Sequence, residues 1–158
     1  MIDLILLRHA HAERDASSGR DQDRPLSALG RDQAARAAAW LKQHGAAPQR
    51  VLCSPAARTR GTLEAVVAAY GPLEVREEAE IYEAMPGDLI NVIDRHREAR
   101  SLLLIGHNPG LESLLALLTQ GRSGDARGMP TGSVAWLRFA PEAPLEPGAA
   151  QLIEFWWP

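Results

Sequence analysis

Four side chains that could bind phosphate follow three short apolar runs of the sequence. They are Arg8 and His9 after Ile2–Leu7, Arg58 just beyond Val51–Cys53, and His107 after Leu102–Ile105 and Gly106. A solid run of Ile, Leu and Val between polar residues is typical of a strand that is buried on both faces of a parallel sheet. Ligands of such sheets bind outside the carboxyl ends of the strands. The spacing therefore predicts an anion site built from three separate parts of the chain.

His9 is the residue best suited to covalent chemistry. Hydrogen bonds of the sheet would fix its backbone at the strand end, while its imidazole faces an accessible crevice. A neutral imidazole can attack phosphorus and form a phosphohistidine, which water then hydrolyses. An isolated Arg-His pair is more often a solvated strand end, so this interpretation depends on the other two sites.

Arg58 and His107 are expected to hold the phosphate. Ser54 and Pro55 predict a helix start that places Arg58 in the first turn, where an arginine is unfavourable unless an anion lies near it. The guanidinium can bind two phosphate oxygens at once. His107, if protonated, would donate to the oxygens that carry charge in phosphoryl transfer. Arg60 is expected to face solvent on another side of the helix.

Alternating strands and helices must position these residues. The expected helices are 27–44, capped by Ser27 and closed by Gly45, one opening at Ser54-Pro55, one over 86–98, and one that opens at Asn108-Pro109 and ends near 120–128. The expected further strands are 50–53, 73–76 and an antiparallel pair, Ser133–Phe139 and Gln151–Trp157. Segment 77–85 is expected to be a loop, and Ala10–Arg24, polar and aperiodic, a mobile loop that could act as a lid.

Composition narrows the classes of protein. The chain has 158 residues, of which 46% are hydrophobic, which suits one domain over residues 1–158. A net charge of −3 shows no basic excess for binding nucleic acid or an anionic membrane, so anion binding must be local. No apolar run in the sequence is long enough to span a membrane, and no secretory signal pattern is expected. The single cysteine, Cys53, is expected to be buried and inert. A cytoplasmic location fits these features.

The remaining histidines are not expected to be catalytic. His44 lies at a helix end, His96 on a polar helical face and His11 in a loop. Their spacing is not that of a zinc site, and the sequence contains no glycine-rich nucleotide loop. We therefore expect no metal and no other cofactor.

Three motifs resemble those of the histidine phosphatase (phosphoglycerate mutase-like) superfamily. They are Leu6-Leu7-Arg8-His9, Ser54-Pro55-x-x-Arg58-x-x-x-Thr62 and Gly106-His107-Asn108-Pro109-Gly110. Three further segments look like those of the SixA-type phosphohistidine phosphatases. These segments are Arg24-Pro25-Leu26-Ser27-x-x-Gly30, Ile81-Tyr82-Glu83-Ala84 and Met129-Pro130-Thr131-Gly132. The resemblance spans nearly the whole chain.

The resemblance implies a mostly parallel α/β sheet of the phosphoglycerate mutase-like kind, with helices on both faces. It implies that His9 is the nucleophile and that Arg8, Arg58 and His107 form the phosphate pocket. The usual Arg-His-Gly of the superfamily is Arg8-His9-Ala10 here. That change narrows the space beside the nucleophile and removes no functional group.

Glu83 is the candidate proton donor. Many relatives have a glutamate followed by Gly-x-Trp-Glu-Gly, whereas Glu83 is followed by Ala84-Met85-Pro86-Gly87. A solvated loop carboxylate is the alternative interpretation. A phosphoramidate substrate would need less acid assistance than an ester, which would explain a weakly specified donor.

The sequence leaves three functions open. The main hypothesis is removal of phosphate from phosphohistidine, on a protein, through a covalent intermediate on His9. The close alternative is the same chemistry on a small phosphate ester, although a chain of this length leaves little room for the cap insertion of larger relatives. The third is a phosphate- or phosphohistidine-binding module without turnover. The expected partner is thus a phosphorylated protein or a small phosphorylated substrate, and the oligomeric state stays open.

Overall fold

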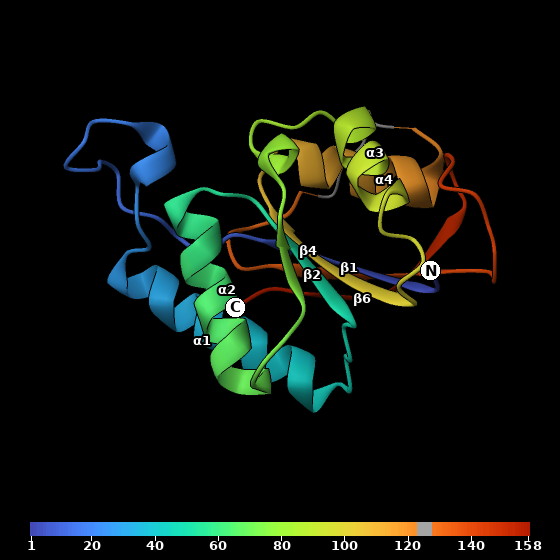
Figure 1. Ribbon diagram of the computed structural model, residues 1–158, viewed down its shortest axis with the longest axis horizontal. Coiled ribbons are helices and arrows are strands. Elements are labelled where there is room, and N and C mark those ends of the chain that lie inside the picture. Colours follow the sequence, from blue (N-terminus) through green and yellow to red (C-terminus); the bar gives the residue numbers. More distant parts are fainter. Residues whose placement is uncertain (123–127) are drawn as a thin grey trace.

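A six-stranded sheet forms the centre of the computed structural model, which describes residues 1–122 and 128–158 (Figure 1). The strands are β1 Asp3–Arg8, β2 Arg50–Cys53, β3 Val75–Glu77, β4 Ser101–Gly106, β5 Val134–Phe139 and β6 Ala150–Trp156. Their order across the sheet is β3-β2-β4-β1-β5-β6; the first four are parallel to one another, β5 is antiparallel to β1, and β6 is antiparallel to β5. The predicted α/β fold with an antiparallel C-terminal pair is confirmed.

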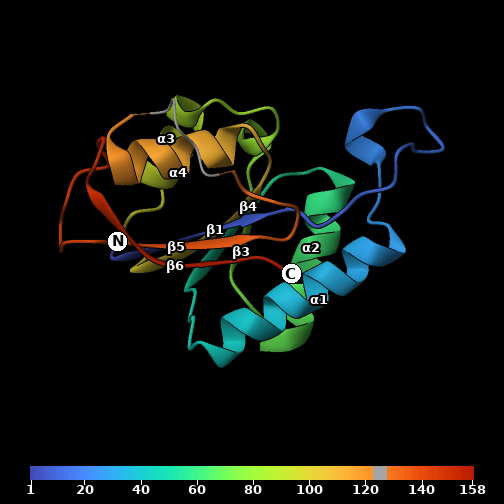
Figure 2. The same ribbon diagram turned by 180° about the vertical axis from the view of Figure 1, so that it is seen from behind.

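Helices cover both faces of the sheet. The helices are α1 Ala28–Gln43, α2 Ala57–Tyr70, α3 Pro86–Asp94 and α4 Gly110–Gln120, with short 3₁₀ turns η1 Asp21–Asp23 and η2 Ala79–Ile81. Helices α1 and α2 lie on one face, and α3 and α4 lie on the other (Figures 1 and 2). None of the helices in the described residues is long and apolar enough to cross a membrane.

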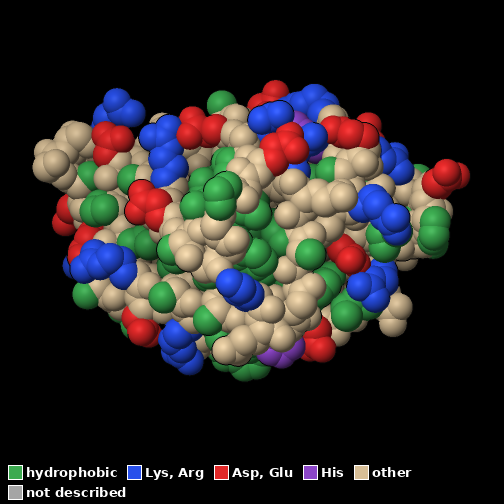
Figure 3. Space-filling view, turned by 60° about the horizontal axis from the view of Figure 1, so that its bottom comes forward, with side chains coloured by type: hydrophobic (Ala, Val, Ile, Leu, Met, Phe, Trp, Pro, Cys, Tyr) green, Lys and Arg blue, Asp and Glu red, His purple; other side chains and the backbone are tan. Residues whose placement is uncertain are grey.

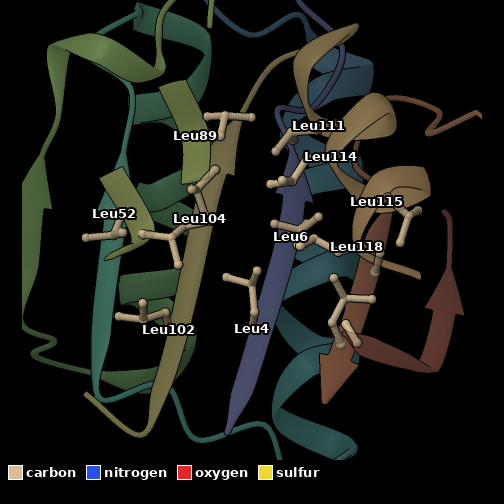
Figure 4. Close-up of a cluster of buried hydrophobic side chains, with 14 of the residues drawn as sticks. Leu4, Leu6, Leu52, Leu89, Leu102, Leu104, Leu111, Leu114, Leu115 and Leu118 are labelled. Atoms are coloured by element: carbon tan, nitrogen blue, oxygen red, sulfur yellow. The ribbon is translucent and has the colours of Figure 1, made fainter. Parts of the chain in front are cut away.

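The solid apolar runs arise because alternate residues of each strand pack under different helices. Leu4 and Leu6 of β1 and Leu104 of β4 belong to the cluster that faces α3 and α4 (Figure 4). Ile5 of β1 and Ile105 of β4 belong to the cluster under α1 and α2. With both faces of the sheet covered, each strand needs an apolar residue at nearly every position.

The strand register brings the predicted site residues to one edge of the sheet. Arg8 of β1 is paired with Gly106 of β4, and Cys53 of β2 is paired with Ile105 of β4. The three parallel strands therefore end side by side, and the next residues of each strand lie at the same edge. The convergence predicted from the three apolar runs is confirmed.

The predicted starts of two helices are wrong. Helix α2 begins at Ala57, and Ala56 precedes it without a side-chain cap. Helix α4 begins at Gly110, with Pro109 at the cap position. In both cases the expected capping side chain has another partner, because Ser54 bonds the ring of His107, and Asn108 donates to Glu112 and to the carbonyl of Met129.

Other boundaries are closer to the prediction. Ser27 caps α1 by accepting from the backbone N–H of Gly30, and Gly45 follows the helix with a φ of 74°. Strand β3 is Val75–Glu77 rather than 73–76, and the expected loop 77–85 contains η2. Helix α3 ends at Asp94 rather than at 98. The end of α4 is closed by Gly121 in a left-handed conformation, and most of the predicted 120–128 segment lies outside the described residues.

Segment 10–24 leaves the sheet edge and reaches away from the body beside the first turn of α2 (Figures 1 and 2). It contains η1, and Ala12 pairs with Leu26 in an isolated antiparallel bridge. Its mobility stays a prediction. On the face of the molecule seen in Figure 3, positive and negative side chains are interspersed.

Candidate active site

The imidazoles of His9 and His107 lie beside each other at the ends of β1 and β4. Their ring centroids are 5.2 Å apart, and both residues are at least nine-tenths buried. The backbone N–H of His9 donates to the carbonyl of Gly106 at 3.0 Å, which continues the β1–β4 pairing by one residue. The sheet thus fixes the backbone of His9, as expected for a strand-end residue.

A backbone contact sets the tautomer of His9. Its Nδ1 lies 2.8 Å from the carbonyl oxygen of Ala10. A carbonyl oxygen only accepts, so Nδ1 carries the proton and Nε2 keeps its lone pair. The ring nitrogen that could attack phosphorus is therefore Nε2.

Thr62 connects the end of β1 to helix α2. Its Oγ1 accepts from the backbone N–H of Ala10 at 3.0 Å and donates to the carbonyl of Arg58 at 2.8 Å. The buried hydroxyl thereby ties the backbone beside His9 to the turn of α2 that carries Arg58. This contact accounts for the threonine four residues after the arginine in the sequence.

Arg58 is held by a residue of the 10–24 segment. Its Nη1 donates to the backbone carbonyl of Asp21 at 2.9 Å, and its Nη2 donates to Oδ2 of the same residue at 3.1 Å. The hydroxyl of Tyr82 donates to that same Oδ2 at 2.7 Å. The guanidinium carbon of Arg58 lies 5.9 Å from the centroid of the Tyr82 ring. Arg60, by contrast, is exposed, as predicted, and it pairs with Glu77.

Several polar atoms of the predicted phosphate-binding residues have no protein partner. Within the described residues, the buried unpartnered atoms include Nε of Arg8, Nε of Arg58 and Nδ1 of His107. The other contact of Arg8 is a hydrogen bond from Nη1 to the carbonyl of Met129 at 2.7 Å. Buried polar groups are normally satisfied, so unused donors gathered at one place favour a site for a bound acceptor.

Burial and neighbouring cations keep both histidines neutral. Burial lowers the pKa of His9 from 6.5 to about 4, and the positive charges of Arg58 and Arg8 add to the effect. The pKa of His107 is lowered to about 3, mainly by burial and then by His9 and Arg58. His107 is thus a neutral ring in the unliganded protein. A bound dianion would raise the pKa of His107 and favour the protonated ring, which could donate to the phosphoryl oxygens.

A cavity of about 240 Å³ opens beside Arg58 and His107, and neither Arg8 nor His9 is among its lining residues. Arg58, in the first turn of α2, and His107, just before α4, lie on its wall. Segment 82–85 adds Tyr82, Glu83, Ala84 and Met85. Ile81 is buried in the core, and it anchors this segment so that the residues after it lie at the rim. The cavity therefore has a polar wall of Arg58 and His107 and an apolar wall that includes Met85.

Glu83 lies on the wall of this cavity and is exposed. Its φ of 57° is in the left-handed region, which is uncommon for a residue with a side chain. The structure places Glu83 near Arg58 and His107 through the shared cavity. Its role as proton donor stays a prediction.

Three residues of the site were missed as functional residues. Asp21 lies in an aperiodic segment whose position no sequence pattern predicts. Tyr82 stands beside Glu83 in a motif, which was the available signal. Ser54 was expected as a helix cap and as part of a motif, without a contact to His107, yet its Oγ lies 2.7 Å from Nε2 of His107.

The other histidines and the cysteine make no contact with Arg8, His9, Arg58 or His107 that the structure records. His11 bonds the hydroxyl of Ser27, and His44 bonds the carbonyl of Trp40. His96 follows the end of α3 instead of lying on its face, and its ring bonds Glu78 at 2.7 Å. Cys53 is buried, which raises its pKa to about 12. The described residues contain no group of three or more His, Cys, Asp or Glu that could hold a metal ion.

Comparisons with known proteins agree with this arrangement. Residues 4–92 match the family model described as the histidine phosphatase superfamily, branch 1. The phosphohistidine phosphatase SixA of Escherichia coli is 32% identical over 127 residues, which are 76% of either chain. An uncharacterized chloroplastic protein of Arabidopsis thaliana is 39% identical over 127 residues, and the match spans 73% of this chain and 58% of that protein.

A solved structure has the same fold over the full length. It is the protein histidine phosphatase SixA complexed with tungstate, with a TM-score of 0.82, 25% identity, and coverage of 99% of this chain and 97% of that chain. The chain therefore belongs to the histidine phosphatase superfamily, and in sequence and fold it is similar to the SixA members.

Proposed function

We propose that this protein is a phosphohistidine phosphatase that acts on a protein substrate through a covalent intermediate on His9. The observation that carries the proposal is the state of His9, a neutral ring whose Nδ1 is anchored on a carbonyl, beside arginines with unused donors. Nucleophilic catalysis on phosphorus needs a free ring nitrogen and cations that stabilise the transferred oxygens.

The first step transfers the phosphoryl group to His9. Nε2 forms a bond to phosphorus as the bond between phosphorus and the imidazole nitrogen of the substrate breaks, and that nitrogen takes up a proton. Arg8 and Arg58 bind the phosphoryl oxygens, and His107 donates to them once the bound anion has raised its pKa. Glu83, on the wall of the cavity, is the proposed source of the proton.

The second step releases inorganic phosphate. Water attacks phosphorus, the bond to Nε2 of His9 breaks, and the proton from the water goes to the carboxylate of Glu83. Nε2 regains its lone pair, so the site returns to its starting state with no net change in protons on the protein. No redox step or additional reactant is needed.

A phosphorylated protein is the substrate that we favour. The cavity is about 240 Å³ and has an exposed apolar residue, Met85, on its rim, which suits the side chain of a protein better than a small polar metabolite. The similarity to SixA, a protein named as a phosphohistidine phosphatase, supports the same choice.

Rapid-quench labelling tests the proposal. The wild-type protein is mixed with a protein carrying ³²P-phosphohistidine, and label on the phosphatase that is acid-labile and base-stable is expected within one turnover. The variant His9→Ala should show neither label nor turnover. Binding of the substrate by the wild type without label or phosphate release would show a binding module and contradict the proposal.

A substrate panel distinguishes the two enzymatic possibilities. kcat/KM is compared for a phosphohistidine protein and for sugar, nucleotide and aryl phosphates. We expect the phosphohistidine protein to be preferred. A strong preference for a sugar phosphate would overturn the choice of substrate while leaving the covalent chemistry intact.

A further inference from the structure

A second cavity borders the first one and shares Asp21 with it. It has a volume of about 340 Å³ and is formed entirely by the projecting 14–24 segment. Three arginines, Arg14, Arg20 and Arg24, lie on its wall, together with Asp15 and Asp21. Figure 1 shows this segment reaching past the first turn of α2. The second cavity thus lies on the outer side of the residue that holds Arg58.

Asp21 lies on the wall of both cavities, and its single negative charge cannot neutralise the arginines of both. Its Oδ1 accepts from Nε of Arg24 at 2.9 Å, and its Oδ2 accepts from Nη2 of Arg58 at 3.1 Å. One carboxylate therefore faces two guanidinium groups, one in each cavity. Asp15 is the other carboxylate on the wall of the second cavity, and Glu83 lies on the wall of the first, so four arginines adjoin the two cavities against three acids.

Arg20 and Arg14 are free to meet a ligand. The Arg20 side chain is 68% exposed, and its ion pair with Asp23 is 3.4 Å long. An exposed ion pair of this kind contributes little to stability, so a ligand can displace it. Arg14 is exposed, and it has no ion pair among the described residues.

The position of these arginines suggests a second anionic group on the substrate. Three arginines and two aspartates lie on the wall of the second cavity, so a ligand that displaces Asp23 from Arg20 meets an excess of one positive charge, in a chain whose net charge is −3. A phosphoryl group between Arg8 and Arg58 would leave the rest of the substrate at the cavity mouth. On one side of Asp21 the substrate meets the apolar wall with Met85, and on the other side it meets Arg14 and Arg20.

We propose that the second cavity is a subsite for the acidic side chains that flank the phosphohistidine of a protein substrate. The proposal rests on the proposed function. A peptide suits both walls, because its apolar side chains can lie against Met85 while its Asp or Glu residues pair with the arginines. Arginine binds carboxylates through two parallel hydrogen bonds, which gives direction as well as charge.

Two phosphohistidine peptides test the subsite. One carries Asp and Glu on both sides of the phosphohistidine, and the other carries Asn and Gln at the same positions. kcat/KM is measured for the wild type, for the double variant Arg14→Gln/Arg20→Gln, and for Arg36→Gln. Arg36 is the matched control, because it is an exposed arginine on α1 whose ion pair with Asp32 is 4.0 Å long.

The wild type should prefer the acidic peptide by about tenfold, which corresponds to one charge-assisted hydrogen bond. The double variant should lose that preference and keep the wild-type kcat/KM for the neutral peptide within about twofold, which also shows that it is folded. Added salt should reduce the preference, because the arginines are exposed. Arg36→Gln should behave as the wild type.

Equal kcat/KM for the two peptides in the wild type would overturn the subsite and leave the proposed function standing. A preference that survives in the double variant would also overturn it. Turnover of neither peptide would contradict the proposed function and the subsite together. If a small bisphosphate, but not the acidic peptide, depends on Arg14 and Arg20, the assignment to a protein substrate is wrong.

Discussion

Asp21 accepts two hydrogen bonds from the guanidinium of Arg58, one on its backbone carbonyl at 2.9 Å and one on its carboxylate at 3.1 Å. The two residues are 37 positions apart in the sequence. The projecting segment therefore sets the orientation of Arg58, the proposed phosphate-binding residue on α2, and the hydroxyl of Tyr82 donates to the same carboxylate oxygen.

Removing the Asp21 carboxylate should impair the site through Arg58. We expect Asp21→Ala to lower kcat/KM by about tenfold, because a small displacement of a positioned group is costly to catalysis. Asp21→Asn keeps an acceptor oxygen and should recover most of the loss, and Tyr82→Phe should have a smaller effect than Asp21→Ala. Steady-state kinetics on a phosphohistidine protein measures all three. Identical losses for Ala and Asn would show that the charge, and not the hydrogen bond, matters.

Loss of the Arg58 side chain should be more severe. Arg58→Ala should lower kcat by about 10²–10³, by analogy with the removal of one preorganised donor to a developing oxyanion. Arg60→Ala is the control, because Arg60 lies on the same helix but is exposed and pairs with Glu77. The control should stay within about twofold of the wild type. A loss below tenfold for Arg58→Ala would contradict its place in the phosphate pocket.

The two buried histidines should titrate well below their ordinary range. NMR of the imidazoles, assigned through His9→Ala and His107→Ala, should give midpoints near 4 for His9 and near 3 for His107. The unfolded chain binds more protons than the folded one between pH 6.5 and these values, so the free energy of unfolding should fall as the pH drops through this window. Phosphate or vanadate should move the His107 midpoint upward, since an anion favours the protonated ring. Midpoints near 6.5 without ligand would refute the burial argument.

A methyl group at Gly110 should disturb the cavity wall. A Cβ on Gly110 would lie 2.4 Å from the carbonyl oxygen of Ala84, so the backbone of the 82–85 segment must move. We expect Gly110→Ala to lower the free energy of unfolding by about 1–3 kcal/mol, which urea denaturation measures. Gly87→Ala is the control, because a Cβ there meets nothing within 4 Å. Equal free energies of unfolding for the two variants would show that segment 82–85 can move without destabilising the fold.

The part of the fold that could be predicted from sequence is the part governed by burial on both faces. The run before Arg8 had to be a central strand, because Ile5 and Leu6 pack under opposite layers of helices. Ser27 was recognised as a cap because its hydroxyl bonds locally, to the N–H of Gly30. Local rules and uniform burial both leave a clear pattern in the sequence.

The parts that could not be predicted depend on contacts between distant segments. Ser54 is a good capping residue by type, but its hydroxyl bonds His107, which lies 53 positions away. The same is true of Asp21, whose contact with Arg58 leaves no periodicity in its own segment. Local rules thus misassign Ser54 and miss Asp21, although the ends of the apolar runs point to Arg8, His9, Arg58 and His107.

The place of β1 in the middle of the sheet has a consequence for how the protein is made. Leu4 pairs with Leu102 on one side and with Leu137 on the other, so β1 must wait for partners that lie far later in the sequence. Long-range pairing of this kind slows folding. A nascent chain on the ribosome cannot complete the sheet around His9 before β5 has left the exit tunnel, so the proposed nucleophile is enclosed only after translation has passed residue 139.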